Sequence, residues 1–284
     1  MKKRIISGVV MGAVVALVLL LGLEVKSVFI TVFLCVIAAI ASFELVINAA
    51  GLKGLLWTLL PSVYTAVMVF LLSDINEQVY LLSATDYMYI DMSTPVAAII
   101  VSVLYFIACA VLILVKHSEF DIGKITVVCA MPTVLAFAFS TLGSIIIATG
   151  GIYYLLLALN FACVCDMGAY FVGVSLGKTK LCPEISPNKT VEGALGGIAS
   201  SIVVSLIITL CYGHFGKILP VLLLTIPLCA AGMAGDLFAS IIKRKAGIKD
   251  YGNLIPGHGG ILDRVDSLLF IAPLVYCLML IGAL

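Results

Sequence analysis

The chain has 284 residues, of which 63% are hydrophobic and 11% are charged, and its formal net charge is +1. Soluble domains contain about 25% charged residues, so this composition excludes an ordinary soluble protein. The small net charge gives no indication of a nucleic-acid partner, because only the positions of the charges are informative here. The long apolar runs predict an all-α fold, a polytopic bundle of membrane-spanning helices.

Nine apolar runs are long enough to cross the hydrocarbon core of a bilayer as helices. In chain order they are Ile5–Leu23, Ser27–Ile47, Leu55–Leu72, Pro95–Val115, Ile125–Ala148, Ile152–Val174, Val191–Tyr212, Ile218–Ile242 and Val265–Leu284. The first run follows a basic amino terminus. Its length and the lack of an A-x-A-like cleavage site predict a retained span rather than a signal peptide.

The basic residues predict the orientation, because cytoplasmic loops carry an excess of Lys and Arg. With the amino terminus in the cytoplasm, every basic residue except Lys26 and Lys217 is cytoplasmic. The longest outside loop, Ser73 to Thr94, contains four acidic residues and no basic one. The compact chain also favours a bacterial cytoplasmic membrane, with the active site facing the cytoplasm.

Most of the remaining polarity lies in two cytoplasmic loops, Ser175 to Thr190 and Lys243 to Arg264. We therefore expect residues 1–150 to form a scaffold of helices and residues 151–284 to form the catalytic region. The nine cysteines contain no C-x-x-C pair and lie mostly within apolar runs. They predict neither a disulfide framework nor a zinc site.

Three acidic residues, Glu44, Asp166 and Asp236, fall within predicted spans. A charged side chain in a membrane is costly and usually faces a protein interior or a water-filled cavity. Asp236 shares a helix face with Ser240 and Lys243, at spacings of four and seven residues, and this face leads into the second loop. Glu44 has no companion motif, so structural pairing or snorkelling is favoured for its side chain.

Two more acids, Asp263 and Asp266, lie three residues apart where the last helix begins, and therefore project together. If they converge with Asp236, the three carboxylates suit Mg²⁺. The alternative is that Asp236 pairs with Lys243 or Arg264 while the other two acids cap the helix. The depth of Asp236 in the membrane favours the metal site.

A basic, glycine-rich segment separates these acids. It contains Lys243-Arg244-Lys245, Lys249 and the run from Gly252 to Gly260. Basic side chains neutralise phosphate, and glycines let backbone N–H groups approach phosphate oxygens. A topological signal or contact with anionic lipids explains the basic triplet equally well. It does not explain Pro-Gly-His-Gly-Gly followed directly by acids; by itself, His258 is more typical of a loop hydrogen-bonding residue.

The first loop predicts a second wall of the same anion-binding pocket. Asp166, Lys178 and Lys189 are its candidate residues. The sequence Gly177-Lys178-Thr179 is not a P-loop, because the spacing from the preceding glycine is one residue too short. Ser186-Pro187 predicts a turn that enters the seventh helix.

The segment from Ser240 to Asp266 reads S-I-I-K-R-K-A-G-I-K-D-Y-G-N-L-I-P-G-H-G-G-I-L-D-R-V-D. It resembles the hallmark of phosphatidate cytidylyltransferases, also called CDP-diacylglycerol synthases. The segments Asp166–Gly173 and Ser186–Gly193 are similar to a second region of that family, although Asn188 stands where a lysine is more usual. The resemblance covers roughly Asn160 to Leu284.

This resemblance implies that CTP and phosphatidate react to give CDP-diacylglycerol and pyrophosphate. It implies Mg²⁺ at Asp236, Asp263 and Asp266, allows a second cation such as K⁺, and suggests a homodimer. The basic residues expected to hold the lipid phosphate and pyrophosphate are Lys243, Arg244, Lys249 and Arg264. Those expected near the nucleotide or its phosphates are Asp166, Lys178, Lys189 and His258.

Two alternative functions fit parts of the pattern. An ion-coupled transporter would explain Asp166 and Asp236, but it predicts broken helices in two related halves, which the sequence lacks. A CTP-dependent lipid kinase, or a cytidylyltransferase for an ether lipid, would keep the cation site and change the reaction or the acceptor. A CDP-alcohol phosphotransferase is disfavoured because its D-G…A-R…G…D…D pattern is absent.

Overall fold

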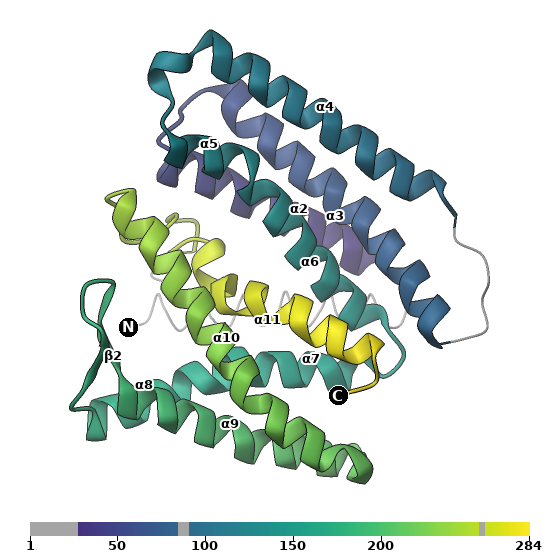
Figure 1. The fold of residues 1–284 in the computed structure, drawn as a ribbon, viewed down its shortest axis with the longest axis vertical. Helices are drawn as coiled ribbons and strands as arrows, with labels where there is room; N and C mark the ends of the chain where they lie inside the picture. Colours follow the sequence, from purple (N-terminus) through teal and green to yellow (C-terminus); the bar gives the residue numbers. More distant parts are fainter. Residues whose placement is uncertain (1–27, 85–90, 256–258) are drawn as a thin grey trace. The chain divides into compact units, whose positions relative to one another are not determined.

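The computed structural model describes residues 28–84, 91–255 and 259–284. Helices dominate this part of the chain (Figure 1), which confirms the predicted all-α membrane fold. Seven helical segments in it are long and apolar enough to cross a membrane: Val28–Ala49, Leu55–Leu82, Ser93–Val115, Ile122–Ile147, Gly151–Leu176, Val191–Cys211 and Phe215–Lys245. The predicted span Ile5–Leu23 lies outside the described residues. The chain divides into two compact units, Met1–Ile147 with Lys245–Val265, and Ala148–Arg244 with Asp266–Leu284.

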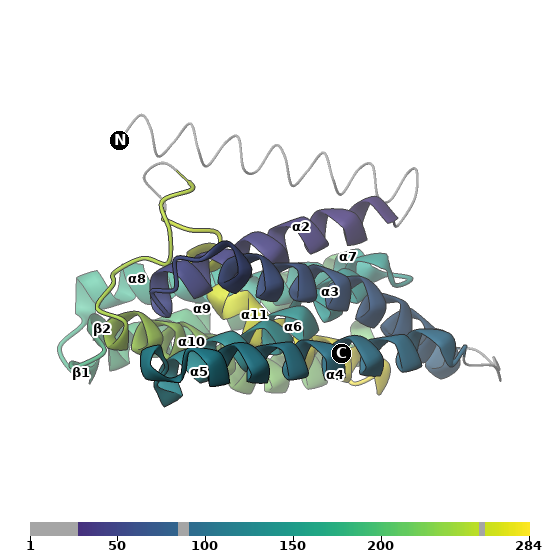
Figure 2. The same ribbon diagram turned by 90° about the horizontal axis from the view of Figure 1, so that it is seen from above.

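The first unit is a bundle built around α3, which packs against α2, α4 and α6 (Figures 1 and 2). Its helices are α2 (Val28–Glu44), the π-helix η1 (Leu45–Ala49), α3 (Leu55–Ala84), α4 (Ser93–Val115), the 3₁₀ turn η2 (His117–Glu119), α5 (Ile122–Cys129) and α6 (Met131–Ile147). Tyr64 of α3 stacks on Tyr105 of α4, with ring centroids 3.8 Å apart.

Helix α3 is longer than the sequence predicted. We expected a loop from residue 73 to 94, but α3 continues to Ala84. The polar side chains beyond Ser73 find partners on the helix and its neighbour. Gln78 Nε2 donates to Asp74 Oδ2 at 2.8 Å, one turn away, and Asn76 Nδ2 donates to Ser140 Oγ of α6 at 3.3 Å. These bonds offset the cost of polar groups in a helix, so hydropathy alone placed the end too early.

The predicted span Ile125–Ala148 is two helices, α5 and α6, joined at Ala130. The break precedes Pro132, which has no N–H to donate to the carbonyl of Val128. The hydroxyl of Tyr105 donates to that carbonyl instead. A side chain from α4 thus satisfies the backbone group that the proline leaves without a helical partner.

The second unit begins with one continuous helix made of α7 (Gly151–Leu159), the π-helix η3 (Asn160–Val164) and α8 (Cys165–Leu176). Its remaining helices are α9 (Val191–Cys211), the 3₁₀ turn η4 (Phe215–Lys217), α10 (Ile218–Lys245) and α11 (Leu262–Leu280), whose first residues belong to the first unit. Buried Asn160 fixes η3 against α9, because its Nδ2 donates to Ser201 O at 3.1 Å and to Ser205 Oγ at 2.8 Å.

Glycines let α8 and α9 pack closely. A Cβ added at Gly168 would lie 2.9 Å from Ser200 Cβ and 3.2 Å from the carbonyl oxygen of Gly196. At Gly196 it would overlap the side chain of Val172. Small residues at helix contacts are a common way for membrane helices to approach each other. This packing fixes the position of α8, which carries Asp166.

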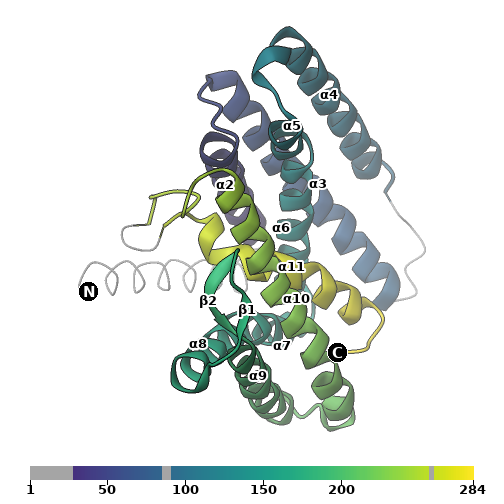
Figure 3. The ribbon, with the colours of Figure 1, turned by 60° about the vertical axis from the view of Figure 1, so that its left-hand side comes forward.

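A β-hairpin joins α8 to α9 (Figure 3). Strands β1 (Lys180–Cys182) and β2 (Ser186–Thr190) are antiparallel, with Lys180 opposite Thr190. The sequence predicted only a turn at Ser186-Pro187, because strands this short have no readable alternation. Thr190 ends β2 and caps α9, with its Oγ1 accepting the N–H of Gly193 at 3.1 Å.

Candidate functional site

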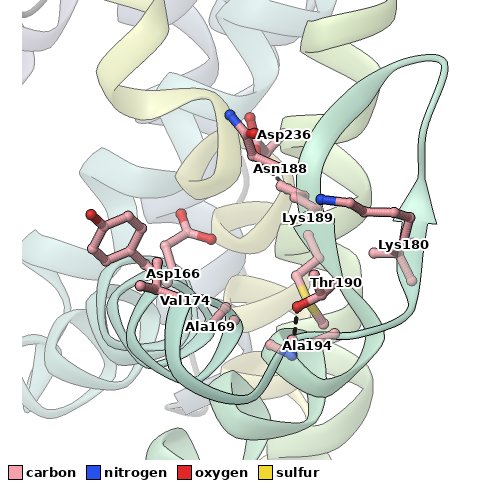
Figure 4. A pocket seen from close by; sticks show the side chains of 15 residues that line it. Asp166, Ala169, Val174, Lys180, Asn188, Lys189, Thr190, Ala194 and Asp236 are labelled. Carbon is pink, nitrogen blue, oxygen red and sulfur yellow. Dashed lines mark hydrogen bonds and ion pairs between the residues drawn. The ribbon is translucent and has the colours of Figure 1, made fainter.

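A cavity of about 520 Å³ opens in the second unit between α8, the hairpin, the start of α9 and α10. Asp166 lines it from α8 and Asp236 from α10, while Lys180 and Lys189 reach it from the hairpin (Figure 4). Gly173 and other small residues of the α8–α9 contact lie along its wall. The close packing of those helices therefore leaves room for a ligand beside the charged side chains.

Lys189 of β2 forms an ion pair with Asp236 of α10. The two side chains are 25% and 26% exposed. The hairpin thus supplies the cation that offsets an acidic residue within a membrane helix, as expected for a buried charge. From the sequence, Asp236 was expected to bind the metal and Lys189 to lie near the nucleotide, and the structure brings the two side chains together.

A second pair lies beside the first. Lys243 Nζ of α10 is 4.0 Å from Asp266 Oδ2 of α11, and the side chains are 12% and 14% exposed. The next residue, Ser267, donates its hydroxyl to Asp166 Oδ2 at 3.3 Å. Residues from α8, α10 and α11 are therefore connected through polar contacts within one unit.

The carboxylates of Asp166, Asp236 and Asp266 interact electrostatically with one another. Lys189 and Lys243 pair with Asp236 and Asp266, and Lys180 also lines the cavity, so the three carboxylates face three cations. Carboxylate oxygens suit Mg²⁺, which usually takes one or two carboxylates together with substrate phosphates. Within the described part of the chain, no three His, Cys, Asp or Glu side chains are close enough to hold an ion by themselves. The donor set fits a metal that a phosphate ligand helps to bind.

Asp263, the third predicted metal ligand, lies in the first unit and contacts backbone amides. Its Oδ2 accepts the N–H of Tyr251 at 2.8 Å and the N–H of Gly260 at 3.0 Å. These bonds connect Tyr251, within the loop between α10 and α11, to Gly260 just before α11 begins. Its role as a metal ligand stays a prediction.

The remaining predicted phosphate ligands are on the surface. Arg244, Lys249, Arg264 and Lys178 are exposed. The backbone N–H of Lys178 donates to Glu192 Oε2 at 3.1 Å, which fixes the entry to the hairpin. His258 lies outside the described residues.

Glu44 does not snorkel, contrary to one of the two expectations. It is 6% exposed, and its Oε2 accepts the N–H of Leu262 at 3.2 Å. The sequence offered no signal for this contact, because 218 residues separate the two partners.

Lys180 is a cavity residue that sequence analysis did not select. Without the hairpin register, nothing separates it from the other lysines of the loop. Asn188 also lines the cavity, so the departure from the expected lysine removes a positive charge at the site.

Comparison with known proteins extends the sequence resemblance. Residues 2–281 match the sequence profile of the cytidylyltransferase family. The phosphatidate cytidylyltransferase of Bacillus subtilis (strain 168) is 34% identical over 289 residues, covering 98% of this chain and 97% of that protein. That of Staphylococcus epidermidis (strain ATCC 12228 / FDA PCI 1200) is 47% identical over 130 residues, covering 46% of this chain and 50% of that protein. The similarity thus includes the amino-terminal half, beyond the region from Asn160 to Leu284 that the motifs indicated.

Proposed function

The chain belongs to the cytidylyltransferase family, and we propose that its reaction, transfer of CMP from CTP to phosphatidate, takes place at the cavity beside the Lys189–Asp236 pair. The observation that carries this proposal is the meeting of Asp166, Asp236 and Asp266 with two lysines next to a cavity of about 520 Å³. That volume is in the range of small-molecule sites.

The reaction brings two polyanions together. An oxygen of the phosphatidate phosphate attacks the α-phosphorus of CTP, the bond from that phosphorus to the β-phosphate oxygen breaks, and pyrophosphate leaves. No base is required, because a phosphate monoester is largely ionised near neutral pH. The site must therefore position the two phosphates and offset their repulsion.

We assign Mg²⁺ to Asp236 and Asp266, with Asp166 beside them. When bound, Mg²⁺ screens the repulsion between the substrates and stabilises the charge that develops in the transfer. Lys189 and Lys243 hold these carboxylates in the absence of substrate. Lys189 and Lys243 would be available to bind the substrate phosphates if these carboxylates held the metal. Lys180 and Arg244 are candidates for outer phosphate contacts, while the roles of Lys249 and Arg264 stay predictions from the sequence.

We also propose nine spans, with the amino terminus and the site in the cytoplasm. This count adds the predicted first span and α11, which carries three charged residues near its start, to the seven described segments. The test uses a variant in which every cysteine except Cys182 of the hairpin is replaced. In intact cells, the thiol of Cys182 should not react with a membrane-impermeant maleimide until the membrane is opened. The homodimer stays a prediction that light scattering in detergent would test.

The deciding experiment uses purified protein with phosphatidate, Mg²⁺ and CTP labelled either in cytidine or at the γ-phosphate. We expect cytidine label, and no γ-phosphate label, in the extracted lipid. Recovery of the γ-phosphate label would indicate a lipid kinase. An absence of lipid-dependent CTP turnover would contradict the proposal and favour a transporter. An ether-linked acceptor that is used in preference to phosphatidate would change the substrate assignment only.

A further inference from the structure

The carboxylate of Glu44 lies between two points of the loop that joins α10 and α11. A Cβ at Gly260 would lie 2.5 Å from Glu44 Oε2, and one at Gly252 would overlap Oε1 and lie 2.8 Å from the carboxylate carbon. Both glycines therefore make room for one acidic side chain from α2. Among the described residues, Oε1 has no hydrogen-bond donor, whereas Oε2 accepts the N–H of Leu262.

A second residue of the same segment holds the beginning of this loop. Asn48, one turn after Glu44, donates its Nδ2 to the carbonyl oxygens of Glu44 and Tyr251. Tyr251 is 1% exposed, and its own N–H donates to Asp263. The end of α2 and η1 therefore fixes the loop at residue 251 and again where α11 begins.

The contact with Leu262 determines the start of α11. Leu262 is the first residue of that helix, so its N–H has no acceptor within the helix. Glu44 provides the acceptor, and a negative charge at this end is favoured by the helix dipole. Asp266 follows one helical turn later, so a shift at Leu262 would be passed directly to Asp266.

We infer that Glu44 is a positioning residue for the transfer reaction, fixing the loop at Gly252, Gly260 and Leu262 and, through the first turn of α11, the carboxylate of Asp266. The inference rests on the proposed function of Asp266. It assigns a task in the reaction to the amino-terminal bundle, which the sequence indicated only as scaffold. Glu44 acts through shape and one hydrogen bond, and contacts neither substrate nor metal.

The test compares Glu44→Ala, Glu44→Gln, Gly252→Ala and the double variant Glu44→Ala/Gly252→Ala. We expect kcat to fall about tenfold in Glu44→Ala, because a small misplacement of a reacting group is costly, with a smaller change in KM. Glu44→Gln should recover most of kcat, because the amide oxygen can accept the N–H of Leu262. Gly252→Ala should impair transfer by crowding the carboxylate.

The double variant separates positioning from general damage. With the carboxylate removed, the added methyl group has space, so the combined loss should be smaller than the product of the two single losses. Multiplied losses, or a Glu44→Gln variant as slow as Glu44→Ala, would overturn the inference. Glu119→Ala is the matched control, because Glu119 is an exposed acid of the same unit whose carboxylate pairs with Lys116.

A measurement independent of turnover completes the test. Hydrogen exchange of peptides covering residues 250–262 should be faster in Glu44→Ala than in the wild type, and unchanged in Glu119→Ala. Unchanged exchange together with full wild-type activity would refute the inference alone. Faster exchange in Glu44→Ala together with an inactive wild type would refute the proposed function, while retaining the role of Glu44 in holding the loop.

Discussion

Lys189 and Asp236 form an ion pair that connects the β-hairpin to the middle of a membrane helix. The two residues lie 47 positions apart (236 − 189) in the sequence, and each had been assigned to a different part of the site. Their contact makes the hairpin a wall of the cavity rather than a simple connection between α8 and α9.

Replacing Asp236 with Asn should lower transfer by about 100-fold or more, because the carboxylate that we assign to Mg²⁺ and that pairs with Lys189 loses its charge. The measurement is incorporation of cytidine label into lipid, with size-exclusion chromatography to check folding. Glu184→Gln is the control, since Glu184 is an exposed acid in the turn of the same hairpin. Near-normal activity of Asp236→Asn would remove this residue from the site.

Replacing Lys189 with Gln should raise the KM for CTP by about tenfold, the effect of losing one charge-assisted phosphate contact. The initial rate should be measured over a range of CTP concentrations at saturating phosphatidate. Lys116→Gln, which removes an exposed cation of the first unit, is expected to leave KM unchanged. An equal rise in both variants would point to a general charge effect rather than a specific contact.

Metal dependence should distinguish Asp266 from Asp263. Chelation by EDTA should abolish transfer and added Mg²⁺ should restore it. In Asp266→Asn, the Mg²⁺ concentration for half-maximal rate should rise several-fold, because a carboxylate that we assign to Mg²⁺ loses its charge.

Asp263→Ala should instead lower the melting temperature, because the N–H groups of Tyr251 and Gly260 lose their acceptor, at about 1–3 kcal/mol per buried group. If Asp263 acts through these backbone bonds alone, its replacement should change the Mg²⁺ requirement little. A several-fold rise would support the sequence-based prediction that Asp263 binds the metal.

Gly168→Ala should destabilise the contact between α8 and α9 by about 1–3 kcal/mol, because the new methyl group meets the side chain of Ser200. Melting in detergent and the transfer rate should both fall. Adding Ser200→Gly removes the obstructing side chain and should restore most of both. If the second substitution gives no recovery, the close approach at this point does not limit stability.

The helices of this protein could be predicted well from sequence because apolar length determines whether a segment can span a membrane. Helix ends were harder to predict where polar groups find partners, as Gln78 and Asn76 do in α3. The break before Pro132 could have been read from the sequence, because a proline interrupts a helix. The donor that satisfies the carbonyl of Val128 could not, because it is the hydroxyl of Tyr105 in another helix. Local sequence patterns indicate which conformation a segment prefers, but they do not identify the distant residue that forms hydrogen bonds with its backbone groups.

In the candidate site, too, single residues could be predicted from the local sequence, whereas their contacts with distant residues could not. Asp166 and Asp236 could be selected because an acid within an apolar run is unusual. Their neighbours Lys180 and Lys189 depend on a hairpin too short to leave a sequence pattern. Glu44 was selected for its depth, but its partners in the loop lie more than 200 positions away, and nothing in the run around it identifies them.

The π-helix η3 has a consequence for how the length of this segment can change. A π turn holds more residues than an α turn, and such turns are frequent at functional sites. Removing one residue between Asn160 and Val164 would let this turn become α-helical with almost the same total rotation, so the residues on either side would keep nearly the same facing. Removing one residue from α7 or α8 would instead rotate one side of the helix relative to the other by about 100° and turn Asp166 out of the cavity or Tyr153 away from its partners. A single-residue deletion should therefore be better accepted within η3 than in the α-helices that flank it.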